Sequence, residues 1–396
     1  MDDATEIRRD ALPLRADSDL DPLMKRIGDA RYVLLGEASH GTHEYYAWRA
    51  ALTRRLIEER GFSFVAVEGD WPDCYRVHRS VTLADDAPHD PLDALRGFER
   101  WPTWMWANTD VLSFARWLRQ HNAALPAERR VGFFGLDVYS LWDSLRAVLG
   151  YLREHQPERL ERAVSAIRCF EPYGEDPREY ALAARQNAEV AAGAERYYRA
   201  MVSGGEASWN VRDEHMADTL DRLLDRYGPQ AKAVVWEHNT HVGDARATDM
   251  AARGLLNVGQ LARERHGEDR VVLVGLGCHR GRVVVARSWG ARMALMPVPP
   301  ARGGSLEDVL HGTGLGRALF VHPRGDAAQE WLEDVLDHRA IGVVYHPDVE
   351  RWRNYVPTTL GRRYDAFLWW EETSALRPLH AEPAVSGEFE AFPSGE

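Results

Sequence analysis

The sequence is poor in the features that mark exported, membrane-spanning or disulfide-stabilised proteins. It has 3 cysteines in 396 residues and no Cys-x-x-Cys spacing, which fits neither a disulfide framework nor a cysteine-rich zinc module. No apolar run approaches the roughly 18 residues that predict a membrane span. Residues 1–12 alternate acidic and basic side chains and lack the apolar segment of a signal peptide. We therefore expect a cytoplasmic protein in a reducing compartment.

Positive charge is also scarce. Lys and Arg number 49 against 61 Asp and Glu, which gives a formal net charge of -12. This balance works against binding a polyanion and against docking on an acidic lipid surface. We expect neither nucleic acid nor a membrane as a partner, and the sequence does not indicate an oligomeric state.

Several short motifs that identify common enzyme classes are missing. The sequence contains no Gly-x-Ser-x-Gly nucleophile motif, no Gly-Lys-Ser/Thr phosphate loop and no His-Glu-x-x-His zinc motif. Gly275, Gly277 and Gly281 follow an apolar run, but their spacing is one residue off the dinucleotide-binding form. These absences disfavour a covalent serine hydrolase, a nucleotide hydrolase and a nicotinamide enzyme.

What the chain does contain is a series of short apolar runs with helical stretches between them. This alternation predicts an α/β fold with a central, mostly parallel sheet flanked by helices. The predicted strands are 31–35, 63–67, 131–136, 232–236, 271–276, 341–345 and 366–370. Between the first two strands, residues 44–60 carry an apolar helical stripe that stops at Gly61.

Residues 142–228 read differently, because they have no convincing strand and contain long amphipathic segments at 179–201 and 212–226. We predict that they form a helical insertion that caps the active-site cleft, and that residues 1–141 and 229–380 form the α/β catalytic core. Residues 381–396 are rich in Glu, Pro, Ser and Gly, which predicts a disordered tail.

Polar side chains follow four of the predicted strands at the point where each strand ends. The carboxyl ends of parallel strands meet at one edge of a sheet, so these side chains are expected to converge on one cleft. In chain order they are Glu37, His40, Glu68, Asp70, Asp137, His238 and His241.

The turn after the first strand is the densest of these clusters, with the sequence GEASHGTHE at residues 36–44. An imidazole such as that of His40 can take a proton from water, and a neighbouring carboxylate such as Glu37 can orient the ring. In the alternative interpretation, Ser39 or Thr42 only caps the helix and the histidines are solvated. Capping, however, requires fewer polar groups than this turn contains.

The turn after the fourth predicted strand also contains two histidines, His238 and His241. Histidines three residues apart can reach one substrate oxygen or one metal ion, although two surface histidines are the simpler alternative. Arg49 lies on the helix after His40, and Arg212 opens a later helix. Each arginine can hold a carboxylate or clamp a substrate oxygen, or it can form an ordinary surface ion pair.

The side chains predicted to bind substrate are distributed over the same strand ends and the segments next to them. Trp71 lies in a tryptophan-rich region that includes Trp101, Trp104 and Trp106, which can line an apolar pocket or pack in the core. The full predicted set is His43, Trp71, Arg212, Asn239 and His279.

Taken together, the sequence resembles the erythromycin esterase family from about residue 31 to residue 379. The matching motifs are LGEASHGTHE at 35–44, VAVE at 65–68, GLD at 135–137, NVRD at 210–213, WEHNTHVGD at 236–244 and YDA at 364–366. The family's catalytic residues match, in chain order, Glu37, His40, Arg49, Glu68, His238 and His241. The sequence departs from the antibiotic-inactivating members of the family at Cys278-His279-Arg280, where small polar residues are expected.

The resemblance implies hydrolysis of a carboxylic ester or lactone, such as that of a macrolide, by an activated water and without a covalent intermediate. His40 would be the general base and Glu37 would orient it, while Glu68 and Arg49 would hold the carboxylate network. His238 or His241 would donate a proton to the carbonyl oxygen or the leaving alkoxide.

Other functions are consistent with the same residues. One is a biosynthetic enzyme that uses the site for acyl transfer, cyclisation or elimination, and another is a non-catalytic protein that binds a small molecule. We expect no cofactor. If a divalent metal is used, its ligands would come from Glu37, His40, Glu68, His238 and His241.

Overall fold

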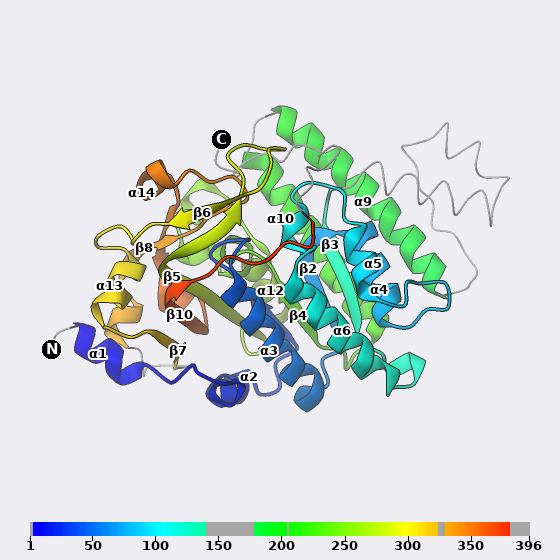
Figure 1. Cartoon of the computed structure of the whole chain (residues 1–396), viewed down its shortest axis with the longest axis horizontal. Helices are drawn as coiled ribbons and strands as arrows, with labels where there is room; N and C mark the ends of the chain where they lie inside the picture. Colours follow the sequence, from blue (N-terminus) through cyan, green and yellow to red (C-terminus); the bar gives the residue numbers. More distant parts are fainter. Residues whose placement is uncertain (1–2, 140–177, 204–205, 324–328, 381–396) are drawn as a thin grey trace.

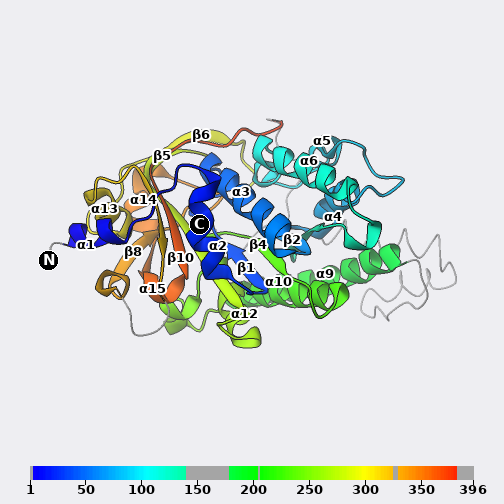
Figure 2. The same cartoon turned by 90° about the horizontal axis from the view of Figure 1, so that it is seen from below.

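A central mixed sheet organises the molecule. The computed structural model describes residues 3–139, 178–203, 206–323 and 329–380. The strands run in the order β3-β2-β4-β1-β5-β10-β7, with β6 beside β5; Figure 1 shows most of this sheet, and Figure 2 marks β1. Their bounds are β1 Tyr32–Leu35, β2 Phe64–Asp70, β3 Gly132–Asp137, β4 Ala233–Trp236, β5 Val271–Val285, β6 Ala294–Val298, β7 Arg317–Val321 and β10 Ala366–Thr373. Neighbouring strands from β3 to β10 are parallel, whereas β7 and β6 pair antiparallel with β10 and β5.

Helices cover both faces of this sheet. Figure 2 shows α2, α3 and α6 on one face and α10 and α12 on the other. The helices are α1 Asp3–Asp10, α2 Asp21–Ile27, α3 His43–Arg60, α4 Trp71–Val81, α5 Pro91–Arg96, α6 Thr109–Ala123, α9 Arg178–Ser203, α10 Glu206–Tyr227, α11 Asn239–Val242, α12 Val258–His266, α13 Leu306–Gly312, α14 Glu350–Arg353 and α15 Leu360–Arg363. None of these described helices has the length and apolar character needed to cross a bilayer.

The first βαβ unit shows why the strands read as continuous apolar runs. Every residue of β1 is buried, because Val33 and Leu35 pack toward α3 while Tyr32 and Leu34 pack toward the opposite helical layer. A strand buried on both faces needs apolar side chains at every position. The helix α3 ends at Gly61, which adopts a left-handed φ of 68°, as helix-terminating glycines often do.

The sequence predicted most of the sheet correctly and one strand wrongly. Residues 341–345 do not form a strand. They form isolated bridges, of Ile341 with Ser39 and of Val344 with Ala286, and both partners lie outside the named strands. Their apolar side chains are nevertheless buried, including Ile341 and Tyr345. A buried loop and a buried strand have the same apolar composition, and this explains the error.

The sequence analysis did not predict four short strands of the described structure. β6 and β7 pair at the margins of the sheet, while β8 (Val335–Arg339) and β9 (Tyr355–Thr359) form a separate antiparallel pair. β8 and β9 mix polar and apolar residues and are only partly buried. They therefore lack the uninterrupted apolar signal of the central strands.

The described part of the predicted insertion consists of α9 and α10, so both predicted helices are confirmed. In α10, Met216, Leu220 and Leu223 belong to the same buried cluster as β1 and β4, which shows that this helix packs on the sheet itself. The rest of the predicted insertion and the predicted tail at 381–396 lie outside the described residues. The division into core and insertion stays a prediction.

Candidate active site

The carboxyl ends of the central strands border one cavity of about 200 Å³. Residues from β2, β3 and the turns after β1 and β4 form its polar end, as the strand order predicts. These lining residues are His40, Glu68, Asp70, Asp137, His238 and His241, together with Arg212 from α10. The convergence of these side chains, which are far apart in the chain, is thus confirmed.

The buried side chains of His40, Glu37 and Arg49 contact one another in that order, leading from the cavity into the protein interior. The Nδ1 atom of His40 lies 3.0 Å from Oε1 of Glu37, and Arg49 donates from Nη2 to the other oxygen of Glu37 at 2.9 Å. Arg49 also contacts the ring faces of Tyr46 and Trp236. Because Glu37 and Arg49 are almost fully buried, their charges depend on each other for stabilisation.

Close packing holds the turn that carries Glu37 and His40. A Cβ atom at Gly36 would lie 2.0 Å from Oδ1 of Asn239, and one at Gly41 would lie 1.9 Å from the carbonyl oxygen of Val284. The Tyr46 hydroxyl donates to the His40 carbonyl at 3.0 Å. The glycines therefore let this turn lie directly against β4 and β5, with little freedom for the His40 backbone.

Glu68 is the centre of a second charged network. Its Oε1 accepts from Nη2 of Arg212 at 2.8 Å and lies 3.4 Å from Nε2 of His241, while its Oε2 accepts from the backbone N–H of His238 at 2.8 Å. Burial disfavours the charged carboxylate, but His241, His40 and Arg212 outweigh that effect and hold the pKa of Glu68 well below its usual value. Glu68 is therefore ionised at neutral pH.

His241 has a carboxylate at each of its ring nitrogens. Nδ1 lies 2.9 Å from Oδ1 of Asp213, and Nε2 faces Glu68. Burial opposes charge on the ring, but Asp213 and Glu68 raise the pKa of His241 well above its usual value. The indole of Trp209 stacks on the ring at 4.5 Å, which favours a cation. His241 therefore holds the network together as an imidazolium.

His238 is in the opposite protonation state. Burial, followed by the nearby His40, lowers the pKa of His238 well below its usual value. Its Nδ1 accepts the backbone N–H of Thr240 at 3.3 Å and lies 2.8 Å from the Thr240 hydroxyl, which can donate to the same nitrogen. This arrangement favours the neutral ring with its proton on Nε2. That Nε2 lies near the Ala38 carbonyl without forming a hydrogen bond of acceptable geometry. The rings of His238 and His40 are 4.9 Å apart.

Two arginines fix the carboxylates at the ends of β2 and β3. Arg212 donates to both oxygens of Asp137, at 3.0 and 2.7 Å, and Arg100 forms a two-pronged pair with Asp70. Both guanidinium groups contact the ring of Tyr139. The sequence analysis missed Arg100, since it lies in a loop about 30 residues from Asp70 and belongs to no motif.

Glu237 differs from every other carboxylate of the site. It is fully buried, and neither of its oxygens has a hydrogen-bond partner among the described residues. Burial raises the pKa of Glu237 well above its usual value, and the neighbouring carboxylates of Glu68 and Asp213 add to this effect. The raised pKa favours the protonated, neutral side chain, which limits the negative charge beside Glu68.

Away from the charged end, the cavity is lined by apolar and aromatic side chains. One wall comes from the segment after α5 and from Trp289, and the other comes from residues 340–356, which precede and include the start of β9. The apolar and aromatic lining residues are Phe98, Pro102, Met105, Trp106, Trp209, Trp289, Ala340, Val343, Val344, Val349, Tyr355 and Val356, and the second wall also contains His346, Arg353 and Asn354. A cavity that combines one polar end with apolar walls suits a small molecule with a single reacting polar group.

Of the residues predicted to bind substrate, Arg212 lines the cavity and the other four do not. His43 pairs with Asp110 at 2.9 Å on the outside of α3, and Trp71 stacks between Tyr75 and Phe134. Both residues follow strand ends, but their side chains point away from the cavity.

Asn239 and His279 likewise face the protein rather than the cavity. The Asn239 side chain donates to the Leu276 carbonyl at 2.7 Å and ties the turn after β4 to β5. The ring of His279 stacks on His311 at 3.9 Å, in a separate cluster. The strand-end rule locates the edge of the sheet but does not determine which way each side chain points.

The five residues considered as metal ligands do not fit a metal centre. Both oxygens of Glu37 and both oxygens of Glu68 are occupied by His40, arginines or a backbone N–H. Both nitrogens of His241 face carboxylates. These donor atoms are directed at one another and not at a common point. They are therefore not arranged to bind one metal ion.

Comparison with known proteins places this arrangement in a family. A family model for erythromycin esterase matches residues 57–185 and 181–373. The chain belongs to the erythromycin esterase family. Membership supports an esterase-like hydrolase, and it was predicted from the motifs. The turn with Glu37 and His40 lies ahead of the matched residues.

Individual relatives of this esterase family member are distant. It is 22% identical over 353 residues to a protein named erythromycin esterase type II from Escherichia coli, covering 75% of this chain and 82% of the relative. A solved protein from Bacillus cereus has a TM-score of 0.77 at 20% identity, covering 96% and 98% of the two chains. A mutant of the erythromycin esterase EreC in its open conformation has a TM-score of 0.64 at 16% identity, covering 93% and 97%. These structures support the fold.

Proposed function

We propose that the protein hydrolyses a carboxylic ester or lactone with a water molecule activated by His40, without a covalent intermediate. The proposal rests mainly on one observation: two histidine rings 4.9 Å apart are held in complementary hydrogen-bonding states at the polar end of the cavity. Pairs of titratable groups whose environments differ in this way identify acid and base roles.

His40 is suited to the role of base by its buried support. When Nδ1 donates to Glu37, the lone pair of the neutral ring lies on Nε2. Glu37 favours the imidazolium that forms after proton transfer, and Arg49 keeps Glu37 ionised and in place. Positioned general bases typically contribute about 10²- to 10⁴-fold to rate.

His238 is suited to the role of donor. Its neutral ring carries the proton on Nε2, and that nitrogen has no hydrogen-bond partner of acceptable geometry among the described residues. A small movement of the substrate or the ring can bring Nε2–H to the carbonyl oxygen, where negative charge develops during attack. His241 is less suited, because both of its nitrogens already face carboxylates.

The walls of the cavity indicate the kind of substrate. Trp106, Trp289 and Tyr355 offer flat apolar surfaces beside the charged end, which favours a bulky, largely apolar ester. The name of the Escherichia coli relative, erythromycin esterase type II, supports including macrolide lactones in the first set of compounds.

The proposal is tested by mass spectrometry of purified wild type and His40→Ala against macrolides and a panel of other lactones and esters. A product heavier by one water, formed only by wild type, is the expected result. A single turnover with excess enzyme in oxygen-18 water then tests the mechanism. Direct attack places the label in the acid formed from the substrate. An acyl intermediate on an enzyme carboxylate, opened by water at the carboxyl carbon of the enzyme, would instead give an unlabelled acid and leave the label on the enzyme.

Two other outcomes of the same screen would favour the alternative functions. A product without added water would favour acyl transfer, cyclisation or elimination at the same residues. Tight binding of one compound without any product would favour a small-molecule binding protein. In that case His40→Ala would change affinity but not turnover.

A further inference from the structure

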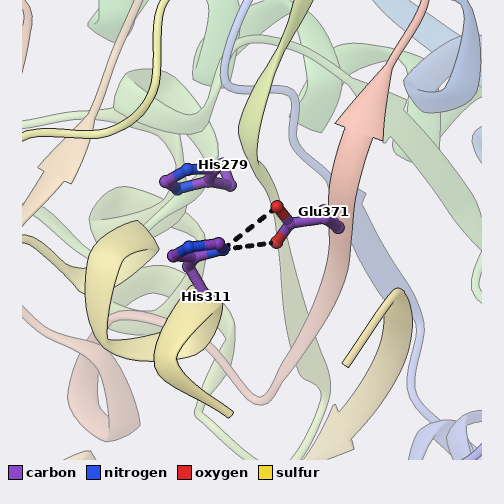
Figure 3. Close-up of side chains that lie close together, drawn as sticks. All are labelled: His279, His311 and Glu371. Atoms are coloured by element: carbon purple, nitrogen blue, oxygen red, sulfur yellow. Dashed lines mark hydrogen bonds and ion pairs between the residues drawn. The ribbon is translucent and has the colours of Figure 1, made fainter. Parts of the chain in front are cut away.

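A second cluster of chemically reactive side chains lies outside the candidate active site. Figure 3 shows His279 from β5, His311 from α13 and Glu371 from β10, grouped between the sheet and a short helix. One ring nitrogen of each histidine and one carboxylate oxygen of Glu371 all lie within 4.8 Å of one another. None of the three side chains lines the cavity described above.

One buried nitrogen atom of this cluster lacks a hydrogen bond to any described residue. His279 is only 4% exposed, and its Nδ1 has no hydrogen-bond partner among the described residues. Buried polar nitrogens usually have a partner, because burial without one costs free energy. An imidazole nitrogen in this situation beside a second imidazole and a carboxylate points to a missing ligand.

All three side chains are positioned by regular secondary structure, namely β5, α13 and β10. In the parallel pairing of β5 with β10, Cys278 lies opposite Trp370 and Arg280 opposite Glu372, so His279 and Glu371 are neighbours on the same face. His311 lies in the last turn of α13, and Nδ1 of His311 is 2.9 and 3.0 Å from the two Glu371 oxygens. The ligand set is therefore largely arranged before any ion binds.

We propose that His279, His311 and Glu371 form a binding site for a zinc-type transition metal ion. Two imidazoles and one carboxylate are common ligands for such ions, and three protein ligands leave a fourth position for water. The ligands are unsuitable for Mg²⁺ and Ca²⁺, which prefer oxygen. The site is independent of the proposed hydrolase function.

Binding requires a small, local change. Ligand atoms about 2.1 Å from a tetrahedral zinc ion are roughly 3.4 Å apart, so the present set must close by roughly 1.4 Å at most. The two rings stack at 3.9 Å with an interplanar angle of 9°, and one of them must tilt to direct both lone pairs at one ion. The His311 side chain is 47% exposed and on the last turn of a short helix, so it is the ring that can tilt.

The test is zinc binding to the full-length, chelator-treated protein, measured by isothermal titration calorimetry and by the visible absorption of bound Co²⁺. We expect one ion per chain for wild type and no binding of Mg²⁺. His311→Ala and Glu371→Gln should each raise Kd by roughly tenfold or more, since even supporting residues of metal sites carry effects of that size. Zn²⁺ should also raise the Tm of wild type more than that of either variant.

A matched control is available on another part of the surface. His266 pairs with Asp221 at 2.8 Å and stacks on Tyr32 at 4.3 Å, so it has a carboxylate and a stacked ring but no second histidine. His266→Ala should leave the Kd for Zn²⁺ unchanged. Absence of binding to wild type would overturn the proposal. Binding that survives Glu371→Gln and His311→Ala but is lost in His40→Ala would also overturn it, because the ion would then occupy the candidate active site.

Discussion

The candidate active site and the His279 cluster are built from the same residue types but differ in how their polar atoms are satisfied. Around Glu68, the carboxylates are matched by arginines and by the imidazolium of His241. Around His279, His311 and Glu371 pair with each other, and the buried Nδ1 of His279 has no partner in the part of the chain that the structure describes. The paired charges around Glu68 position one another and leave Nε2 of His238 and the Glu237 carboxyl without a partner among the described residues, whereas around His279 the atom left over is a nitrogen that can bind a metal ion.

The largest expected difference between the two regions is in turnover. His40→Ala should lower kcat/KM by about 10²- to 10⁴-fold, as expected for loss of a general base, with an unchanged far-ultraviolet circular dichroism spectrum. Glu371→Gln should leave kcat/KM unchanged on the same substrate. A His40→Ala enzyme with normal kcat/KM would remove the basis for the assigned base.

His43→Ala is the matched control for that measurement. His43 lies three residues after His40 but points outward to Asp110, so its removal should change kcat/KM by less than about twofold. A large loss of kcat in His43→Ala with normal KM would contradict this expectation. It would show that His43 contributes to catalysis although its side chain points away from the cavity.

The next difference is in stability. Arg49→Met should lower the free energy of unfolding by about 3–5 kcal/mol, because it leaves the buried charge of Glu37 without its partner. The double variant Glu37→Gln/Arg49→Met should recover part of this loss. Urea unfolding monitored by tryptophan fluorescence measures both, and an Arg49→Met protein as stable as wild type would contradict the buried ion pair.

The pH dependence of the free energy of unfolding tests whether Glu237 differs from the other carboxylates of the site. The pKa of Glu237 is raised in the folded protein, so above its unfolded pKa of about 4.3 the native state holds the proton more tightly than the unfolded state. Stability gained from this group is therefore present at low pH and lost as pH rises toward the folded pKa. Glu237→Gln should be increasingly more stable than wild type as pH rises from about 4 to 8. Parallel curves of unfolding free energy against pH would contradict a protonated Glu237.

The smallest expected effect is that of chelation on turnover. Since the ligand atoms around Glu37 and Glu68 are directed at one another, stripping with a chelator should leave kcat/KM unchanged. The same treatment should lower the Tm of zinc-loaded protein if the His279 cluster binds the ion. Loss of activity restored by a divalent ion would show that the active site reorganises around a metal.

Much of this arrangement was accessible from the sequence, for a physical reason. Strands buried on both faces give uninterrupted apolar runs, so β1 to β5 and β10 were located, and with them the polar residues at their ends. The motif matches correctly identified the family. The direction in which a side chain points depends on one residue of register and on packing. The sequence therefore did not show that Asn239 and Trp71 face away from the cavity.

Protonation states were also beyond the sequence. His238 and His241 are three residues apart and chemically identical, yet burial makes one neutral while two carboxylates make the other cationic. Asp213 and Glu68 reach His241 from other elements of the fold. Only the three-dimensional structure therefore assigns different roles to the two rings.

The wall formed by residues 340–356 has a consequence for how such proteins diversify. Its first part forms single bridges from Ile341 to Ser39 and from Val344 to Ala286, which lie outside the strands, and it adds no ladder to the sheet. Glu68, Asp137 and the histidines His40, His238 and His241 instead lie on β2, β3 and the turns after β1 and β4. Mutations in this wall can reshape the cavity while leaving the proposed acid and base groups untouched. Substrate preference can then drift between lineages while the reaction is inherited, which makes this wall the natural place to exchange segments when redirecting the enzyme.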